Sequence, residues 1–158
     1  MKSNVSFAAL ILSISVLLDC QSSPNFDVLR SEILEIHNEF INAHLNKNVD
    51  YIANTVTEDY MFISNGAIRK PTKEETKTQF TSYLNNTTFS EYRYLGEPVV
   101  GFSDDGSLAW STAKLKVVAK QKMADGTESD YESVYAWTTI FRRDGNGWLR
   151  LSETSTNK

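Results

Sequence analysis

Residues 107–154, SLAWSTAKLKVVAKQKMADGTESDYESVYAWTTIFRRDGNGWLRLSET, decide the fold of this chain. The stretch contains three runs rich in β-branched and aromatic residues, which are 107–120, 131–142 and 148–154. Asp125-Gly126 and Asp144-Gly145 lie between these runs, and an Asp-Gly pair in that position is a strong signal for a tight hairpin turn. The stretch therefore predicts an antiparallel meander of long strands.

Strand patterns continue toward the N-terminus. Residues 89–102 predict a further strand, in which Pro98 indicates an edge position or a bulge, and Asp105-Gly106 provides the turn that follows. Upstream, the apolar run 60–63 meets Asn65-Gly66, so we expect a short hairpin there.

Helical patterns precede these strands. From Asp27, an expected N-cap, apolar residues recur at steps of four and three as far as 46–48, which is the spacing of one helix face. A shorter pattern of the same kind begins at Val49. Thr72 and Glu75 stand at capping-box spacing, so a third helix is expected to begin there and to end at 85–86. Since helices bury an apolar face, this order predicts an α+β fold with the helices packed on one face of the sheet.

Composition narrows the class of protein. The chain has 158 residues with a formal net charge of −4, which favours one domain, here residues 27–156, and provides no basic footprint for nucleic acid. A single cysteine excludes an internal disulfide framework and a multi-cysteine metal site. No cluster with metal-ligand spacing accompanies His37 and His44, and no phosphate loop is present, so neither a metal nor a cofactor is expected.

The N-terminus has the pattern of an export signal. Residues 5–18 carry no charge and follow Lys2, but they are too few to span a bilayer as a helix. Cys20 ends this segment in a sequence that resembles a bacterial lipobox, which implies an export signal over 1–19, a lipid on Cys20 and a linker over 20–26. The expected location is therefore the cell envelope, with membrane attachment only through that lipid. Cleavage near Ser22 or Ser23, giving a soluble secreted or periplasmic protein, is the alternative.

Four short motifs, in this order and spacing, resemble the nuclear-transport-factor-2-like superfamily and its SnoaL-like and ketosteroid-isomerase-like group: Ala43 to Ile52, Thr57 to Phe62, Asn65-Gly66 with Pro71 to Glu75, and Phe141 to Leu151. Within the superfamily the chain looks like a bacterial lipoprotein-type member. The resemblance implies a cone in which a strongly curved antiparallel sheet wraps around the first helix and leaves a cavity. The superfamily includes enzymes, small-molecule binders and interaction modules, so the fold alone does not name an activity.

Ketosteroid isomerase chemistry is not supported by the residues. That family uses a general-base Asp, a Tyr and a protonated Asp. The matching positions here are Ser64, Phe40 and Trp137, none of which supplies the required acid or base. We therefore expect a binding protein rather than this type of enzyme.

Strand alternation and the first helix nominate a ligand pocket: Phe40, His44, Tyr60, Phe62, Ser64, Trp110, Tyr135, Trp137, Leu151 and Glu153. The first hypothesis is an exported binder of a small apolar or aromatic molecule. The alternatives are a lyase or isomerase that uses His44 and Glu153, and a homodimeric interaction module that pairs through its sheet. Aromatic side chains that merely fill the core would favour the last of these.

Overall fold

The structure is a computed structural model that describes residues 23–145 and 147–158. The predicted export signal and Cys20 lie outside the described residues. The elements follow in the order α1 (Phe26–Leu45), α2 (Val49–Asn54), β1 (Val56–Ser64), β2 (Ala67–Arg69), α3 (Lys73–Asn85), β3 (Thr87–Tyr94), β4 (Val99–Phe102), β5 (Leu108–Lys122), β6 (Glu128–Asp144) and β7 (Gly147–Asn157).

Local signals account for most element ends. The Thr72 side chain accepts from the Glu75 backbone while Glu75 reaches back to Thr72, so the predicted capping box of α3 is confirmed. The β1–β2 hairpin is also confirmed, with positive φ at Asn65 and Gly66. The predicted N-cap of α1 is wrong: Asn25, not Asp27, accepts from Val28 N, and Asp27 lies in the first helical turn.

The predicted meander forms the centre of a seven-stranded sheet, in the order β2-β1-β7-β6-β5-β3 with β4 also on β5. The single strand expected over 89–102 is interrupted after Tyr94. Its two halves, β3 and β4, pair antiparallel with successive parts of β5, and the break contains Pro98, which cannot donate to a strand ladder. The sheet is not wholly antiparallel, because β1 pairs parallel with β7.

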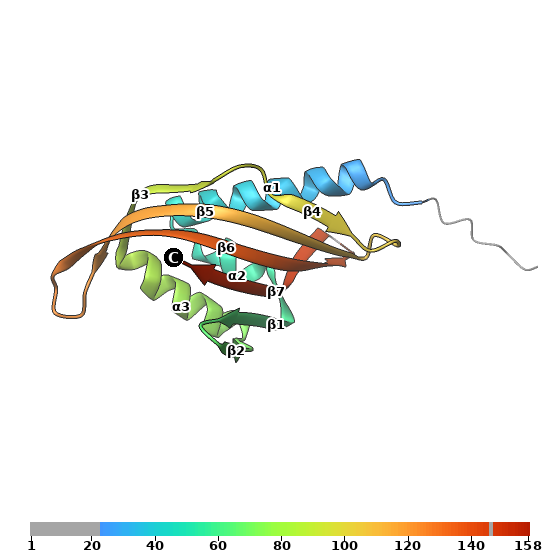
Figure 1. The fold of residues 1–158 in the computed structure, drawn as a ribbon. Helices are drawn as coiled ribbons and strands as arrows, with labels where there is room; N and C mark the ends of the chain where they lie inside the picture. Colours follow the sequence, from blue (N-terminus) through green and yellow to red (C-terminus); the bar gives the residue numbers. More distant parts are fainter. Residues whose placement is uncertain (1–22, 146) are drawn as a thin grey trace, which may run out of the picture.

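Figure 1 shows the sheet curving in front of α1 and α2, with α3 below the β7 side. Buried residues of α1, including Leu29, Ile33 and Phe40, pack in two clusters against the concave face. Apolar burial of this kind is the main favourable term in folding. The α+β cone with helices packed on a curled sheet is therefore confirmed, and it encloses space between α1, α3 and the strands.

Candidate functional site

A cavity of about 260 Å³ lies between α1, α3 and the concave face of the sheet. Seven of its lining side chains are aromatic: Phe40, Phe62, Phe80, Tyr83, Tyr92, Tyr135 and Trp137. Its polar lining comes from His44, Gln79, Glu153 and Ser155. Gln79 on α3 is exposed and Ser155 on β7 is half-buried, so the cavity reaches solvent beside α3.

Six of the ten residues nominated for a pocket line this cavity: Phe40, His44, Phe62, Tyr135, Trp137 and Glu153. They come from α1, β1, β6 and β7, which are distant in sequence, and the cone brings them together. Tyr60 is buried nearby but does not line the cavity; its ring lies 5.8 Å from the guanidinium carbon of Arg150. Ser64 pairs in register with Ser155, at the end of β1, and also lies outside the lining.

The structure corrects the nominations of Trp110 and Leu151. Trp110 is 43% exposed, on the opposite face of the sheet from its buried neighbours Ala109 and Ser111. Leu151 is the extra residue of a bulge in β7: Phe141 pairs with Arg150 whereas Ile140 pairs with Ser152. A bulge reverses the alternation of side chains along a strand. Strict alternation from Glu153 would place Leu151 on the cavity face, and the bulge makes this prediction wrong.

The same bulge turns Arg150 into the interior, and sequence reasoning missed this residue. Arg150 is only 4% exposed and Glu153 7%. The Arg150 Nη1 atom lies 3.2 Å from Glu153 Oε2, while Nη2 donates to the Ile52 carbonyl at 2.7 Å. The guanidinium carbon also lies 4.6 Å from the centre of the Phe40 ring. An arginine between two leucines was a signal, but regular alternation would have placed it and Glu153 on opposite faces.

Hydrogen bonding specifies the tautomer of His44. Its Nδ1 atom lies 2.8 Å from the Phe40 carbonyl oxygen, which only accepts, so Nδ1 carries the proton. Its ring stacks on Tyr92 at a centroid distance of 4.5 Å. Burial, chiefly, lowers the pKa of His44 to about 4, and the positive charge of Arg150 adds to this. The ring is therefore neutral at pH 7, and Nε2 presents a lone pair with no hydrogen-bond partner among the described residues.

His37 differs from His44 although both are buried on α1. Its Nδ1 lies 2.7 Å from the Tyr94 hydroxyl and its Nε2 2.9 Å from Ser111 Oγ, so both ring nitrogens are partnered. Burial, assisted by the charge of Arg150, lowers its pKa to about 4. His37 does not line the aromatic cavity and acts as a buried link between α1 and the sheet.

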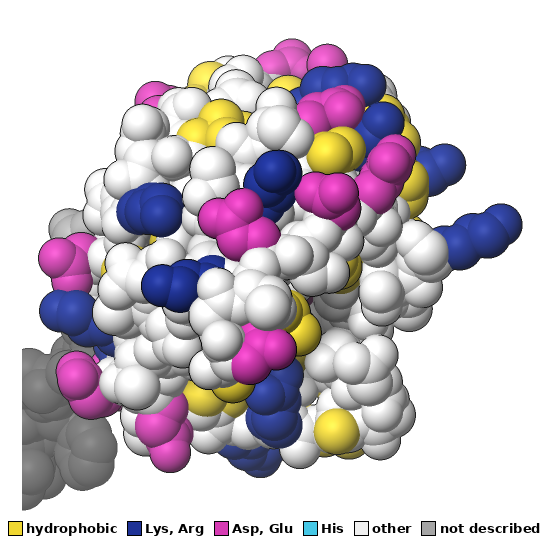
Figure 2. Space-filling view, turned by 90° about the vertical axis from the view of Figure 1, so that its left-hand side faces the viewer, with side chains coloured by type: hydrophobic (Ala, Val, Ile, Leu, Met, Phe, Trp, Pro, Cys, Tyr) yellow, Lys and Arg dark blue, Asp and Glu magenta, His cyan; other side chains and the backbone are white. Residues whose placement is uncertain are grey.

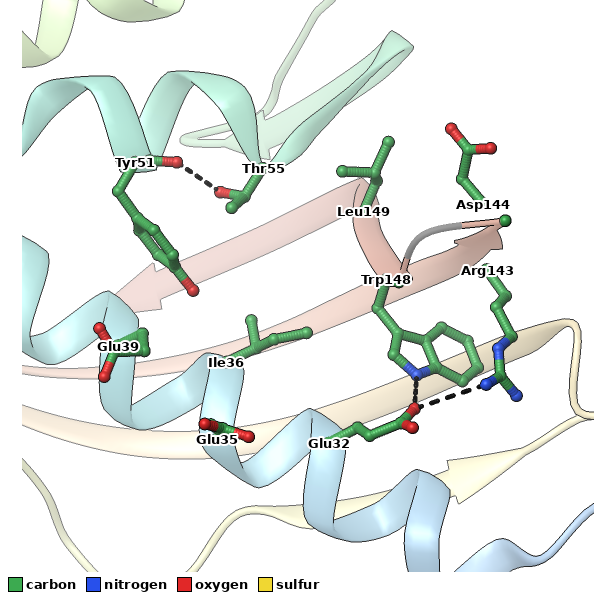
Figure 3. Close-up of a pocket in the computed structure, with 12 residues that line it drawn as sticks. Glu32, Glu35, Ile36, Glu39, Tyr51, Thr55, Arg143, Asp144, Trp148 and Leu149 are labelled. Carbon is green, nitrogen blue, oxygen red and sulfur yellow. Dashed lines mark hydrogen bonds and ion pairs between the residues drawn. The ribbon is translucent and has the colours of Figure 1, made fainter.

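A second, larger depression of about 790 Å³ is an open groove between α1, α2 and the β6–β7 turn. Figure 3 shows Glu32, Glu35 and Glu39 of α1 on one side of it and Trp148 on the other. Glu32 is already engaged, because it accepts from Trp148 Nε1 at 2.8 Å and lies 3.8 Å from Arg143. Glu35 and Glu39 are exposed. The groove is a solvated face, and the more enclosed aromatic cavity is the better candidate site.

The surface carries no dominant charge of one sign on the face that Figure 2 displays, where basic and acidic side chains are interspersed. Within residues 23–145 and 147–158, no group of three or more His, Cys, Asp or Glu side chains is placed to hold a metal ion. In the same part of the chain, no helix is both long and apolar enough to cross a membrane.

Comparison with protein families identifies the fold. The family described as the SnoaL-like domain matches residues 33–152, which is most of the chain. The chain belongs to the SnoaL-like family. No curated protein matches it.

Solved structures show the same NTF2-like architecture as this SnoaL-like chain. An NTF2-like protein from Cytophaga hutchinsonii is 13% identical, with a TM-score of 0.66 over 82% of this chain and 98% of its own. An NTF2-like superfamily protein from Salmonella enterica is 12% identical, with a TM-score of 0.67 over 83% of this chain and 92% of its own. A putative calcium/calmodulin-dependent protein kinase II association domain from Xanthomonas campestris is 16% identical, with a TM-score of 0.56 over 80% of this chain and 86% of its own. These likenesses show the fold.

Proposed function

We propose that this SnoaL-like protein binds a small aromatic molecule in the cavity between α1, α3 and the sheet. The observation that carries the proposal is a partly enclosed space with seven aromatic side chains and few polar groups in its lining, which is the usual composition of a small-molecule site. The cavity has the volume of roughly nine water molecules, so a single ring with a short substituent matches it.

Binding is favoured over proton-transfer catalysis. His44 and Glu153 line the same cavity, which is the arrangement that a lyase or isomerase would need. However, a histidine with a pKa of about 4 is a weak base at neutral pH, and the carboxylate of Glu153 is engaged by Arg150. If the protein turns over a substrate, and if His44→Ala and Glu153→Ala each abolish that turnover, the enzyme alternative is favoured.

Thermal unfolding with one-ring neutral aromatics tests the proposal, since a ligand that binds only the folded state raises the melting temperature. Ser155→Trp places a large ring in the cavity lining and is expected to abolish the shift. Thr156→Trp is the matched control, because Thr156 is exposed on the same strand, and it should keep the shift. Equal shifts in both variants would contradict binding in this cavity.

We also propose that two copies of the chain pair through the outer face of the sheet. Supporting this, Trp110, Ile140 and Val99 are exposed there, and Thr112, Thr138 and Thr154 form an uncharged row across β5, β6 and β7. Exposed apolar side chains beside an uncharged row favour self-association, and the charged neighbours Lys114 and Glu97 lie at the edge of this row. The structural relative from Xanthomonas is described as an association domain. Light scattering should give twice the 17.9 kDa mass of the full chain; a monomer would contradict the proposal.

We further propose export and lipid attachment at Cys20, on the support of the apolar segment 5–18 that Cys20 closely follows. Cells fed labelled palmitate should incorporate it into the wild-type protein and not into Cys20→Ala. Equal labelling of the two would exclude the anchor, and an unlabelled protein in the medium would favour the secreted alternative.

A further inference from the structure

The polar groups of the aromatic cavity indicate which ligands it selects, an inference that rests on the proposed binding function. Apart from the tyrosines, the most buried of them are His44, 3% exposed, and Glu153, 7% exposed. Since Nδ1 of His44 donates to the Phe40 carbonyl, Nε2 can only accept a hydrogen bond from a ligand. Glu153 uses Oε2 for Arg150, and Oε1 has no hydrogen-bond partner among the described residues.

The charged groups near the cavity also favour a ligand that donates a hydrogen bond. Arg150 does not line it, and its guanidinium is held behind Glu153 by the Ile52 carbonyl and Thr55 Oγ1. The cavity is therefore lined by the carboxylate and not by the guanidinium, although the charge of Arg150 reaches His44; both buried histidines are neutral at pH 7. A buried carboxylate repels an anionic ligand and forms strong hydrogen bonds with a donor.

The remaining polar groups of the cavity are neutral, and only Trp137 among them favours an acceptor ligand. The hydroxyls of Tyr83, Tyr92 and Tyr135 can each donate or accept, and the Tyr135 hydroxyl is already paired with that of Tyr131. Trp137 carries a donor-only indole nitrogen. Neither kind of group carries a full charge, so the charged Glu153 dominates the preference, and the acceptor-only Nε2 of His44 acts in the same direction.

We propose that the cavity selects neutral aromatic hydrogen-bond donors, of the phenol or aromatic-amine class, through His44 Nε2 and the free oxygen of Glu153. Aromatic carboxylates of the same size are excluded by the charge of Glu153. Aromatic ethers and hydrocarbons bind weakly, because they leave two buried acceptors without a partner.

Two isomers of identical composition test this at pH 7 with the full chain. 4-Ethylphenol donates a hydrogen bond and 4-methylanisole does not, while 4-methylbenzoate supplies the anion. Calorimetric titration should show 4-ethylphenol binding at least tenfold more tightly than its isomer, and no binding of the benzoate. His44→Phe should reduce the preference between the isomers several-fold. Glu153→Gln, which removes the charge and keeps an oxygen acceptor, should admit the benzoate.

His37→Phe is the matched control, since it removes a histidine that is equally buried on α1 but has both nitrogens partnered. It should lower stability and leave the tenfold preference intact. If the isomers bind wild type equally, or the benzoate binds more tightly, donor selection is wrong and the aromatic binding site stands. If none of the three binds, the proposed function fails as well. A preference that His44→Phe and Glu153→Gln both leave unchanged would also overturn the assignment to these residues.

Discussion

Two buried histidines make stability depend on pH. Each has a folded-state pKa of about 4 against an ordinary value of 6.5, because burial disfavours the charged ring. Between these values the unfolded chain binds more protons than the folded one, so stability is lost as the pH falls from 6.5 toward 4.

We expect the free energy of unfolding to fall on the order of 2 kcal/mol per histidine between pH 7 and pH 5. Denaturant titrations at several pH values measure this slope. His44→Phe should remove about half of it, and a variant that also carries His37→Phe should be nearly flat in this range. If the pH dependence of stability is unchanged in the double variant, it does not come from these two histidines.

The buried pair Arg150 and Glu153 is the second prediction at this scale. Arg150→Met leaves the carboxylate and the Ile52 carbonyl unpaired in the interior, so we expect a loss of about 3–5 kcal/mol in stability. Adding Glu153→Gln should recover part of that loss, because the isolated charge is gone. The four proteins of this double-mutant cycle are compared by denaturant unfolding, and strictly additive effects would exclude coupling.

At the scale of elements, the ends of α3 matter because this helix supplies Phe80 and Tyr83 to the cavity. Thr72→Ala removes the acceptor for Glu75 N, and we expect it to cost about 1 kcal/mol of stability. Thr78→Ala, at an exposed position within α3, should be neutral or slightly stabilising. Chemical denaturation of both variants measures the difference, and equal midpoints would contradict the role of the cap.

Strand β4 positions Trp110 on the outer face. A Cβ at Gly101 would lie 2.4 Å from Cε2 of that ring, so Gly101→Ala must displace the indole. Near-ultraviolet circular dichroism should change with it. Gly145→Ala is the control, since a Cβ there meets nothing within 4 Å, and it should leave the spectrum unaltered.

Elements were predictable where the signal is local. The capping box at Thr72 and the hairpin at Asn65-Gly66 depend on neighbouring residues alone, and both formed as expected. The bulge at Leu151 depends on how β6 and β7 pair, which no local pattern encodes. It is the reason that Arg150 was missed, because strict alternation sends Arg150 and Glu153 to opposite faces.

At the scale of the molecule, the order of helices and strands was sufficient for the α+β class, since helices must bury their apolar face on the sheet, and the resemblance to the superfamily implied the cone. The parallel pairing of β1 with β7 was not foreseen, because it joins two strands separated by most of the chain. The same long-range closure brings Phe62 in register with Glu153 and completes the cavity.

The outer face of the sheet carries the last prediction. Ile140 is exposed and pairs in register with Trp110, so a lysine at position 140 would place a charge at the centre of the proposed contact between two copies. We expect Ile140→Lys to convert a dimer into a monomer, because two like charges would be desolvated against each other. Ile68→Lys, at an isoleucine on β2 that is 69% exposed against 39% for Ile140, is the control and should leave the mass unchanged. Sedimentation of the two variants distinguishes them. A dimer that survives Ile140→Lys but not Ile68→Lys would move the contact to the β1–β2 hairpin, leaving the aromatic cavity on the opposite face of the sheet unaffected.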